Sequence, residues 1–174
     1  SMHADVLVMR HPHSGAPYFV GKNIDAAVIN AGDGTHAHPT QALLDLYTIK
    51  SHLGGISGKK VAIIGDVLYS RVARSNLWGL SKMGADVSVF GPPTLLPPGM
   101  RQGETVAEDH DFAGVVVASS VEEAVDEAEV VMMLRIQKER QSAGHLPSMR
   151  EYSREYGLNS ARLSLARPNA LVMH

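Results

Sequence analysis

Short apolar runs recur along this chain and alternate with segments that have helical spacing. The runs are rich in Val and Ile, as strands are when both faces of their sheet are covered. The candidate strands are Val6–Met9, Ala26–Asn30, Lys60–Gly65, Asp86–Gly91, Gly114–Ala118, Val130–Leu134 and Ala170–Met173. This alternation predicts an α/β fold, a Rossmann-like parallel sheet with helices on both faces.

The segments between the runs carry apolar residues three and four positions apart. The expected helices are Pro39–His52, Ser70–Met83, Val121–Ala128 and Ser148–Tyr156. Gly54 and Gly55 supply the stop signal of the first helix. The proline-rich segment Gly91–Gly103 and the polar segment Gln137–Arg150 are expected to be loops, the second long and mobile.

Composition excludes several classes of protein. The chain has 174 residues and a formal net charge of -2, so nothing favours a nucleic-acid partner. It contains no cysteine, which excludes disulfides and thiolate sites and fits a cytoplasmic setting. No apolar run approaches the roughly 18 residues of a membrane span. Because it begins and ends within predicted core strands, we expect a piece of a longer protein.

Polar residues follow the carboxyl ends of several predicted strands, where ligands bind in open α/β sheets. Arg10, Arg71 and Arg135 all fall at such positions, and a histidine-containing segment, Asn30–His38, falls at another. A single arginine is usually a surface charge. Three arginines on one rim, with histidines beside them, favour a pocket for an anionic ligand.

The stretch "GDGTHAHPTQALLDL" (Gly32–Leu46) places two histidines before a predicted helix. His36 and His38 form an H-x-H pair, which some zinc hydrolases use. No second ligand cluster of the HExxH kind accompanies the pair, so a metal site is not favoured. A dinucleotide site is not favoured either, since the turn Gly65–Ser70 lacks the second and third glycines of GxGxxG.

A different role suits His38. Pro39 fits a first helical turn, so His38 lies at the helix cap, and Gln41 extends from the same end. The positive end of the helix disfavours a protonated imidazole, and a neutral one can donate a hydrogen bond to a carbonyl oxygen. A histidine that merely caps the helix is the alternative. Arg71, directly after the expected N-cap Ser70, opposes the helix dipole, which indicates a functional demand.

Four blocks of sequence occur in an order and at a spacing that carry a resemblance. They are "VMRHP" (Val8–Pro12), "INAGDGTHAHPTQALLDLYTI" (Ile29–Ile49), "IIGDVLYSRVARS" (Ile63–Ser75) and "MMLRIQKER" (Met132–Arg140). Together they closely resemble the catalytic chain of aspartate carbamoyltransferases. Ornithine carbamoyltransferase resembles the chain less, because its helix-start motif typically has cysteine where Thr40 stands and it lacks the "RIQKER" block.

The resemblance implies condensation of carbamoyl phosphate with L-aspartate in pyrimidine biosynthesis, with no metal, cofactor or covalent intermediate. It implies that Arg10 and His38 are catalytic and hold the carbonyl oxygen of carbamoyl phosphate. Gln41 would bind the carbamoyl amino group. Arg71 and Arg135 would each bind one carboxylate of aspartate, with Gln137 beside Arg135.

The resemblance also implies a domain organisation. Residues 1–37 would hold the last strand of the carbamoyl-phosphate domain plus a connection, 38–54 the bridging helix, and 55–174 an incomplete aspartate domain. The parent would be a cytoplasmic homotrimer with shared active sites, to which regulatory chains can be added, and with no nucleic-acid or membrane partner. The family's Ser-x-Arg-Thr loop is absent from this sequence. We therefore expect this chain alone to be inactive; the alternatives are a non-catalytic ligand-binding or scaffold module and, more distantly, a metal-dependent hydrolase.

Overall fold

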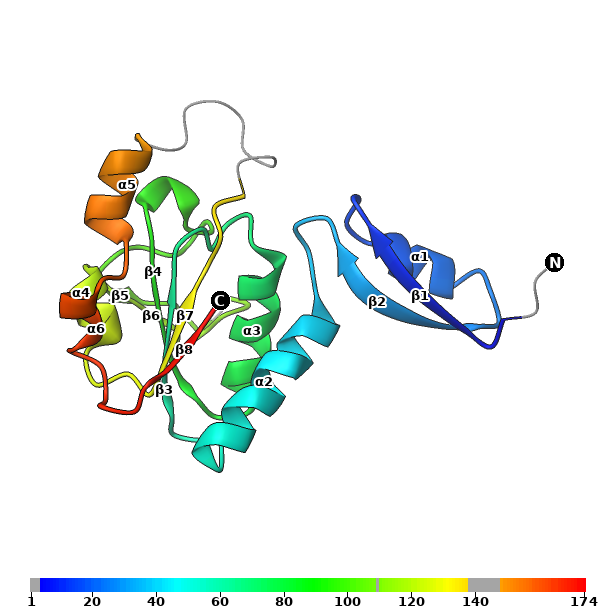
Figure 1. Cartoon of the computed structure of the whole chain (residues 1–174). Helices are drawn as coiled ribbons and strands as arrows, with labels where there is room; N and C mark the ends of the chain where they lie inside the picture. The colour runs from blue at the N-terminus through cyan, green and yellow to red at the C-terminus, as the bar shows by residue number, and fades with distance from the viewer. Residues whose placement is uncertain (1–3, 109, 138–147) are drawn as a thin grey trace.

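The computed structural model describes residues 4–108, 110–137 and 148–174, and it places the strands in two separate sheets (Figure 1). The smaller sheet has two parallel strands, β1 (Val6–His11) and β2 (Ala27–Asp33). The helix α1 (Ala16–Gly21) connects them and packs against them. Figure 1 shows this unit beside the main body, joined to it through the start of α2.

The larger sheet forms the main body and has the strand order β5-β6-β4-β3-β7-β8. Its strands are β3 (Lys60–Ile64), β4 (Asp86–Phe90), β5 (Glu104–Thr105), β6 (Val116–Val117), β7 (Val130–Met133) and β8 (Leu171–Met173). Neighbouring strands are parallel except at one edge, where β5 pairs with β6 in the antiparallel direction. The predicted α/β class with a mainly parallel sheet is confirmed.

Helices cover both faces of the larger sheet (Figure 1). On one face lie α2 (Pro39–Leu53) and α3 (Arg71–Lys82), side by side. The other face carries α4 (Val121–Val125), α5 (Met149–Tyr156) and α6 (Ser160–Leu163). A single 3-10 turn, η1 (Pro93–Leu95), lies after β4. No helix within the described ranges is long and apolar enough to cross a membrane.

The central strand β3 shows why the sheet needs both layers. Val61 and Ile63 point into the apolar cluster shared with α2 and α3, whereas Ala62 and Ile64 point into the cluster shared with α4. All four side chains are almost completely buried. Because successive strand residues face opposite sides, a strand that is apolar at every position can be buried only between two layers.

The structure departs from the expectations in three places. Residues 1–37 hold two paired strands, β1 and β2, where one strand and a connection were expected, and α1, α6 and β5 were not expected from the sequence. The helix expected to reach Ala128 ends at Val125, and Glu127 has a positive φ of 56°. The predicted loop Gln137–Arg150 lies mostly in residues 138–147, which fall outside the described residues.

The packing predicts which substitutions destabilise the fold. Leu77 on α3 is fully buried, whereas Leu43 on α2 is 65% exposed. We expect Leu77→Ala to lower the free energy of unfolding by about 3 kcal/mol, through lost burial and a cavity. The matched change Leu43→Ala should cost less than about 0.5 kcal/mol. Urea denaturation followed by circular dichroism measures both, and equal losses would contradict this assignment of the core.

Candidate active site

All six side chains expected at the site line one cavity of about 300 Å³. Arg10 comes from β1, His38 and Gln41 from the start of α2, and Arg71 from the start of α3; the segment after β7 supplies Arg135 and Gln137. Asp45, Ser70, Met132 and His174 are among the other lining residues. The parallel strands β3, β7 and β8 bring their carboxyl ends to this cavity, as the sequence predicts.

His38 is the N-cap residue of α2. Its backbone N–H donates to Ser75 Oγ at 2.8 Å, and its ring Nδ1 accepts a long hydrogen bond of 3.4 Å from the backbone N–H of Gln41. An Nδ1 that accepts leaves the proton of the neutral ring on Nε2. The capping role and the donor role, which were alternatives in the sequence, are therefore compatible.

The charges around His38 favour its neutral form. Burial lowers its pKa below the ordinary value of 6.5, and the positive charges of Arg71 and Arg10 lower it further. Asp45 opposes this shift without reversing it. A neutral imidazole with its proton on Nε2 can donate to an oxygen that is gaining negative charge.

Gln41 has a fixed partner that sequence reasoning missed. Its Nε2 donates to Asp45 Oδ1 at 2.9 Å, and Asp45 Oδ2 accepts from Asn76 Nδ2 at 2.7 Å. Asp45 is 7% exposed and Asn76 is fully buried. The only signal in the sequence is an acidic residue four positions after Gln41, which places both on one face of the helix.

Arg71 is the first residue of α3 and is only 6% exposed. The N-cap Ser70 accepts from the backbone N–H of Ala73 through its Oγ at 3.1 Å, as expected for a capping serine. Arg71 Nη1 donates to the carbonyl of Gly34 at 3.2 Å. Gly32 has a φ of 116°, and a Cβ there would lie 2.9 Å from Arg71 Cζ, so only glycine leaves room for the guanidinium.

Arg135 is connected through Gln137 to a buried carboxylate, Asp66. Its Nη2 donates to Gln137 Oε1 at 2.9 Å, and the backbone N–H of Gln137 donates to Asp66 Oδ2 at 3.0 Å. Asp66 is fully buried and also accepts from the backbone N–H of Tyr69 at 3.0 Å. Burial, together with the negative charge of Asp66, raises the pKa of Tyr152 to about 12.

The H-x-H pair is divided between two environments. His36 Nδ1 lies 3.1 Å from Asp33 Oδ2, and Asp33 is 1% exposed. Burial alone would raise the pKa of Asp33, but hydrogen bonds from Asn30, Gly15 and His36 lower it overall. His36 thus stabilises the loop after β2, while His38 faces the cavity. Within the described ranges, no three His, Asp or Glu side chains are grouped to hold a metal ion.

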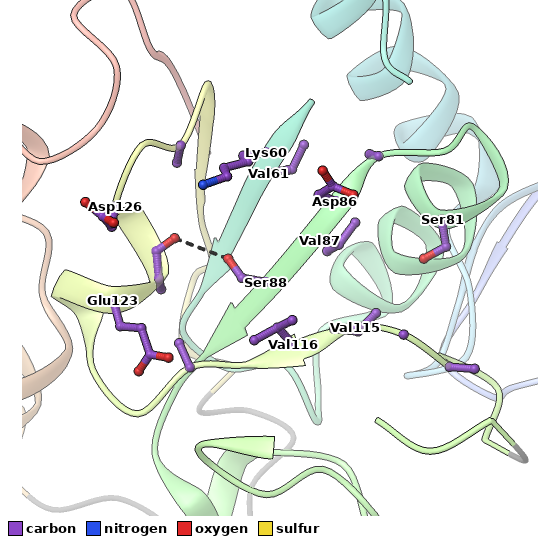
Figure 2. A pocket seen from close by; sticks show the side chains of 16 residues that line it. Lys60, Val61, Ser81, Asp86, Val87, Ser88, Val115, Val116, Glu123 and Asp126 are labelled. Atoms are coloured by element: carbon purple, nitrogen blue, oxygen red, sulfur yellow. Dashed lines mark hydrogen bonds between the residues drawn. The ribbon is translucent and has the colours of Figure 1, made fainter. Parts of the chain in front are cut away.

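Two larger cavities lie elsewhere. One of about 530 Å³ lies at the amino ends of β3 and β4, where Lys60, Asp86, Glu123 and Asp126 surround small apolar side chains (Figure 2). Another of about 470 Å³ is an apolar groove between α2 and α3. Neither contains any of the six expected side chains. Volume alone does not make an active site; the smaller cavity is distinguished by three arginines and a helix-capping histidine that converge on it.

The arrangement suits two anions bound side by side. Guanidinium groups bind carboxylates and phosphates through paired hydrogen bonds, and Arg71 and Arg135 approach the cavity from different elements. His38 Nε2–H and Arg10 can stabilise negative charge that develops on an oxygen between them. The chemistry best supported by such a site is transfer of an acyl group between two anionic reactants.

Two family models match the chain. Residues 1–51 match the aspartate/ornithine carbamoyltransferase carbamoyl-P binding domain, and residues 57–174 match the Asp/Orn binding domain of the same enzymes. The gap between the two matches lies at the end of α2. Aspartate carbamoyltransferase catalytic subunits from Acetivibrio thermocellus and Ruminiclostridium cellulolyticum are 56% and 55% identical over 99% and 100% of this chain. The chain spans about half the length of these curated relatives, 52% in each case.

Solved structures show the same similarity. Aspartate transcarbamoylase from Trypanosoma cruzi, in complex with carbamoyl aspartate and phosphate, is 33% identical with a TM-score of 0.79. The match covers 99% of this chain and 55% of that one. Ornithine carbamoyltransferase from Thermus thermophilus has a TM-score of 0.78 at 24% identity over 98% of this chain and 52% of that one, a likeness of fold alone.

The electrostatics of the cavity predict how His38 titrates. Nuclear magnetic resonance of the isotopically labelled chain should place its pKa below 6.5, with the proton of the neutral ring on Nε2. Arg71→Gln should raise this pKa, because it removes a nearby positive charge. Arg74→Gln is the matched control: Arg74 is exposed on the same helix and pairs with Asp111. A pKa at or above 6.5, or equal shifts in both variants, would contradict the described cavity.

Proposed function

Since the chain belongs to the aspartate/ornithine carbamoyltransferase family, we propose that it forms the aspartate-binding part of an aspartate carbamoyltransferase. That enzyme converts carbamoyl phosphate and L-aspartate to N-carbamoyl-L-aspartate and phosphate, a step of pyrimidine biosynthesis. The observation that carries the proposal is the gathering of Arg10, His38, Gln41, Arg71, Arg135 and Gln137 around one cavity. The curated relatives named as aspartate enzymes favour aspartate over ornithine as the acceptor.

In the proposed reaction, Arg10 and His38 bind the carbonyl oxygen of carbamoyl phosphate, and Arg10 also reaches the phosphate. Attack by the amino nitrogen of aspartate forms the new C–N bond and places negative charge on that oxygen. The carbonyl then re-forms as the C–O bond to phosphate breaks, and the proton lost by the attacking nitrogen leaves with the phosphate. The lowered pKa of His38 supports this role because it favours the neutral ring. The hydrogen bond from Nε2–H to the carbonyl oxygen becomes stronger as negative charge develops on that oxygen.

A dicarboxylate acceptor calls for two separated guanidinium groups. Arg71 and Arg135 supply them, each proposed to bind one carboxylate, with Gln137 beside Arg135. The two substrates repel one another, so the site must hold both anions in attacking position. Positioning and charge stabilisation are therefore expected to provide most of the rate enhancement, with no part for a metal or cofactor.

The proposal extends to the organisation of the protein. Residues 1–37 would contribute the end of a carbamoyl-phosphate domain, α2 (within residues 38–54) the bridge, and residues 55–174 the aspartate domain. Two findings support this division: the domain matches change at the end of α2, and β1–β2 form a sheet of their own.

We further propose a cytoplasmic homotrimer with shared active sites, to which regulatory chains can be added.

Activity measurements test this function. We expect the purified 174-residue chain to form no carbamoyl aspartate, and the full-length gene product to form it from carbamoyl phosphate and L-aspartate. Product formation by the 174-residue chain would contradict the proposed division of the site. No product from the full-length protein, together with no binding of aspartate or succinate to the chain, would contradict the function and favour a scaffold module.

Substitutions in the full-length gene product test the residue roles. His38→Ala should lower kcat by about 10²–10³-fold, as loss of an oxyanion donor does. Arg71→Ala or Arg135→Ala should raise the KM for aspartate by at least about ten-fold, because each removes a charge-assisted contact. Arg74→Ala should leave both constants close to those of the wild type. Unchanged kinetics in the first three variants would overturn the site assignment.

A further inference from the structure

We propose that Asp45 is a positioning residue that fixes the direction of the Gln41 side-chain amide and so makes the site select an acyl phosphate that carries N–H donors. The inference rests on the proposed function. It adds to that function an explanation of how the site distinguishes a carbamoyl group from an acetyl group of similar size.

The direction of the Gln41 amide follows from its partner. An amide has an acceptor side and a donor side, and carboxylate oxygens only accept. Because Gln41 Nε2 donates to Asp45 Oδ1 at 2.9 Å, Oε1 is turned away from Asp45. Gln41 and Asp45 both line the cavity of the site. Gln41 Oε1 is therefore the atom that can accept from a ligand, while one of the two Nε2 N–H groups is taken by Asp45.

Asp45 is itself held from the neighbouring helix. Asn76 Nδ2 donates to Asp45 Oδ2 at 2.7 Å and to the backbone carbonyl of Val72 at 3.1 Å. Asn76 is fully buried, and its Oδ1 has no hydrogen-bond partner among the described residues. Turning this amide over would place Oδ1 against two acceptors. The Val72 carbonyl thus fixes the orientation of the Asn76 amide. Asn76 holds the Asp45 carboxylate in place, and Asp45 fixes the orientation of the Gln41 amide.

This chain of fixed directions has a consequence for ligand choice. The amino group of carbamoyl phosphate offers two N–H donors, and one can reach Gln41 Oε1. The methyl group of acetyl phosphate has a similar size and no donor, so it leaves Oε1 without a hydrogen-bond partner on the ligand. A site built to bond a donor rejects the analogue that lacks it, because an unpaired buried acceptor is costly.

Asp45→Asn tests the inference because an asparagine has one acceptor and one donor. Its amide cannot accept from both Gln41 and Asn76, so one of these two amides must turn over or lose its partner. When Gln41 turns, its own N–H groups face the carbamoyl amino group. Asn76 stays fixed by its bond to the Val72 carbonyl, so Gln41 is the amide that turns.

Steady-state kinetics of the full-length gene product provide the readout. For Asp45→Asn we expect kcat/KM for carbamoyl phosphate to fall at least about ten-fold, with the inhibition constant of acetyl phosphate within about two-fold of the wild type. Asp111→Asn, the same change at an exposed aspartate, should change neither constant. Equal weakening of both acyl phosphates would overturn the inference.

A second measurement does not depend on activity or on the folding of a variant. In the wild-type chain, labelled at glutamine and aspartate, a scalar coupling across the hydrogen bond should connect the Gln41 side-chain N–H to the Asp45 carboxyl carbon. Its absence would overturn the inference even where the enzyme is active. Its presence, together with a full-length gene product that lacks carbamoyltransferase activity, would instead count against the proposed function alone.

Discussion

The close packing of α2 against α3 sets the geometry of the candidate site. Gly79 lies against Leu46 so closely that a Cβ at position 79 would come within 2.9 Å of Leu46 Cδ1. The buried bond between Asp45 and Asn76 joins the same two helices nearer the cavity. Both helices begin at that cavity, so fixing one against the other fixes His38 relative to Arg71. A loose helix pair would leave the two halves of the site free to separate.

Buried carboxylates also order the loops next to the candidate site. Asp33 accepts from Gly15, Asn30 and Ala37, and it stabilises the segment between β2 and α2. Asp66 accepts from the backbone N–H groups of Gln137 and Tyr69, and it orders the segment that carries Arg135. Arg10 and Arg71 line the cavity, where burial and then their positive charges lower the pKa of His38 below its ordinary value. The site is therefore organised for negative charge before a ligand arrives, which is the condition for electrostatic catalysis.

The sequence predicts the parts of this arrangement that depend on local patterns. Continuous apolar runs identify the strands of the larger sheet other than β5, and Pro39 and Ser70 mark the starts of α2 and α3. The positions of Arg71 and Arg135 at strand ends indicate the rim of the site. The partners of Asp45 and Asp66 are not predictable in this way. Asn76 lies 31 positions from Asp45, and Gln137 lies 71 positions from Asp66, so no periodicity connects them. The separation of β1 and β2 from the larger sheet is likewise a matter of long-range pairing.

The central claim is that the cavity at the carboxyl ends of the strands holds both reactants. A crystal structure of the full-length gene product with N-carbamoyl-L-aspartate and phosphate tests it most directly. The account predicts one product carboxylate on Arg71, the other on Arg135, and the carbamoyl nitrogen within hydrogen-bond distance of Gln41 Oε1. Products bound instead in the groove between α2 and α3, or at the amino ends of β3 and β4, would contradict it.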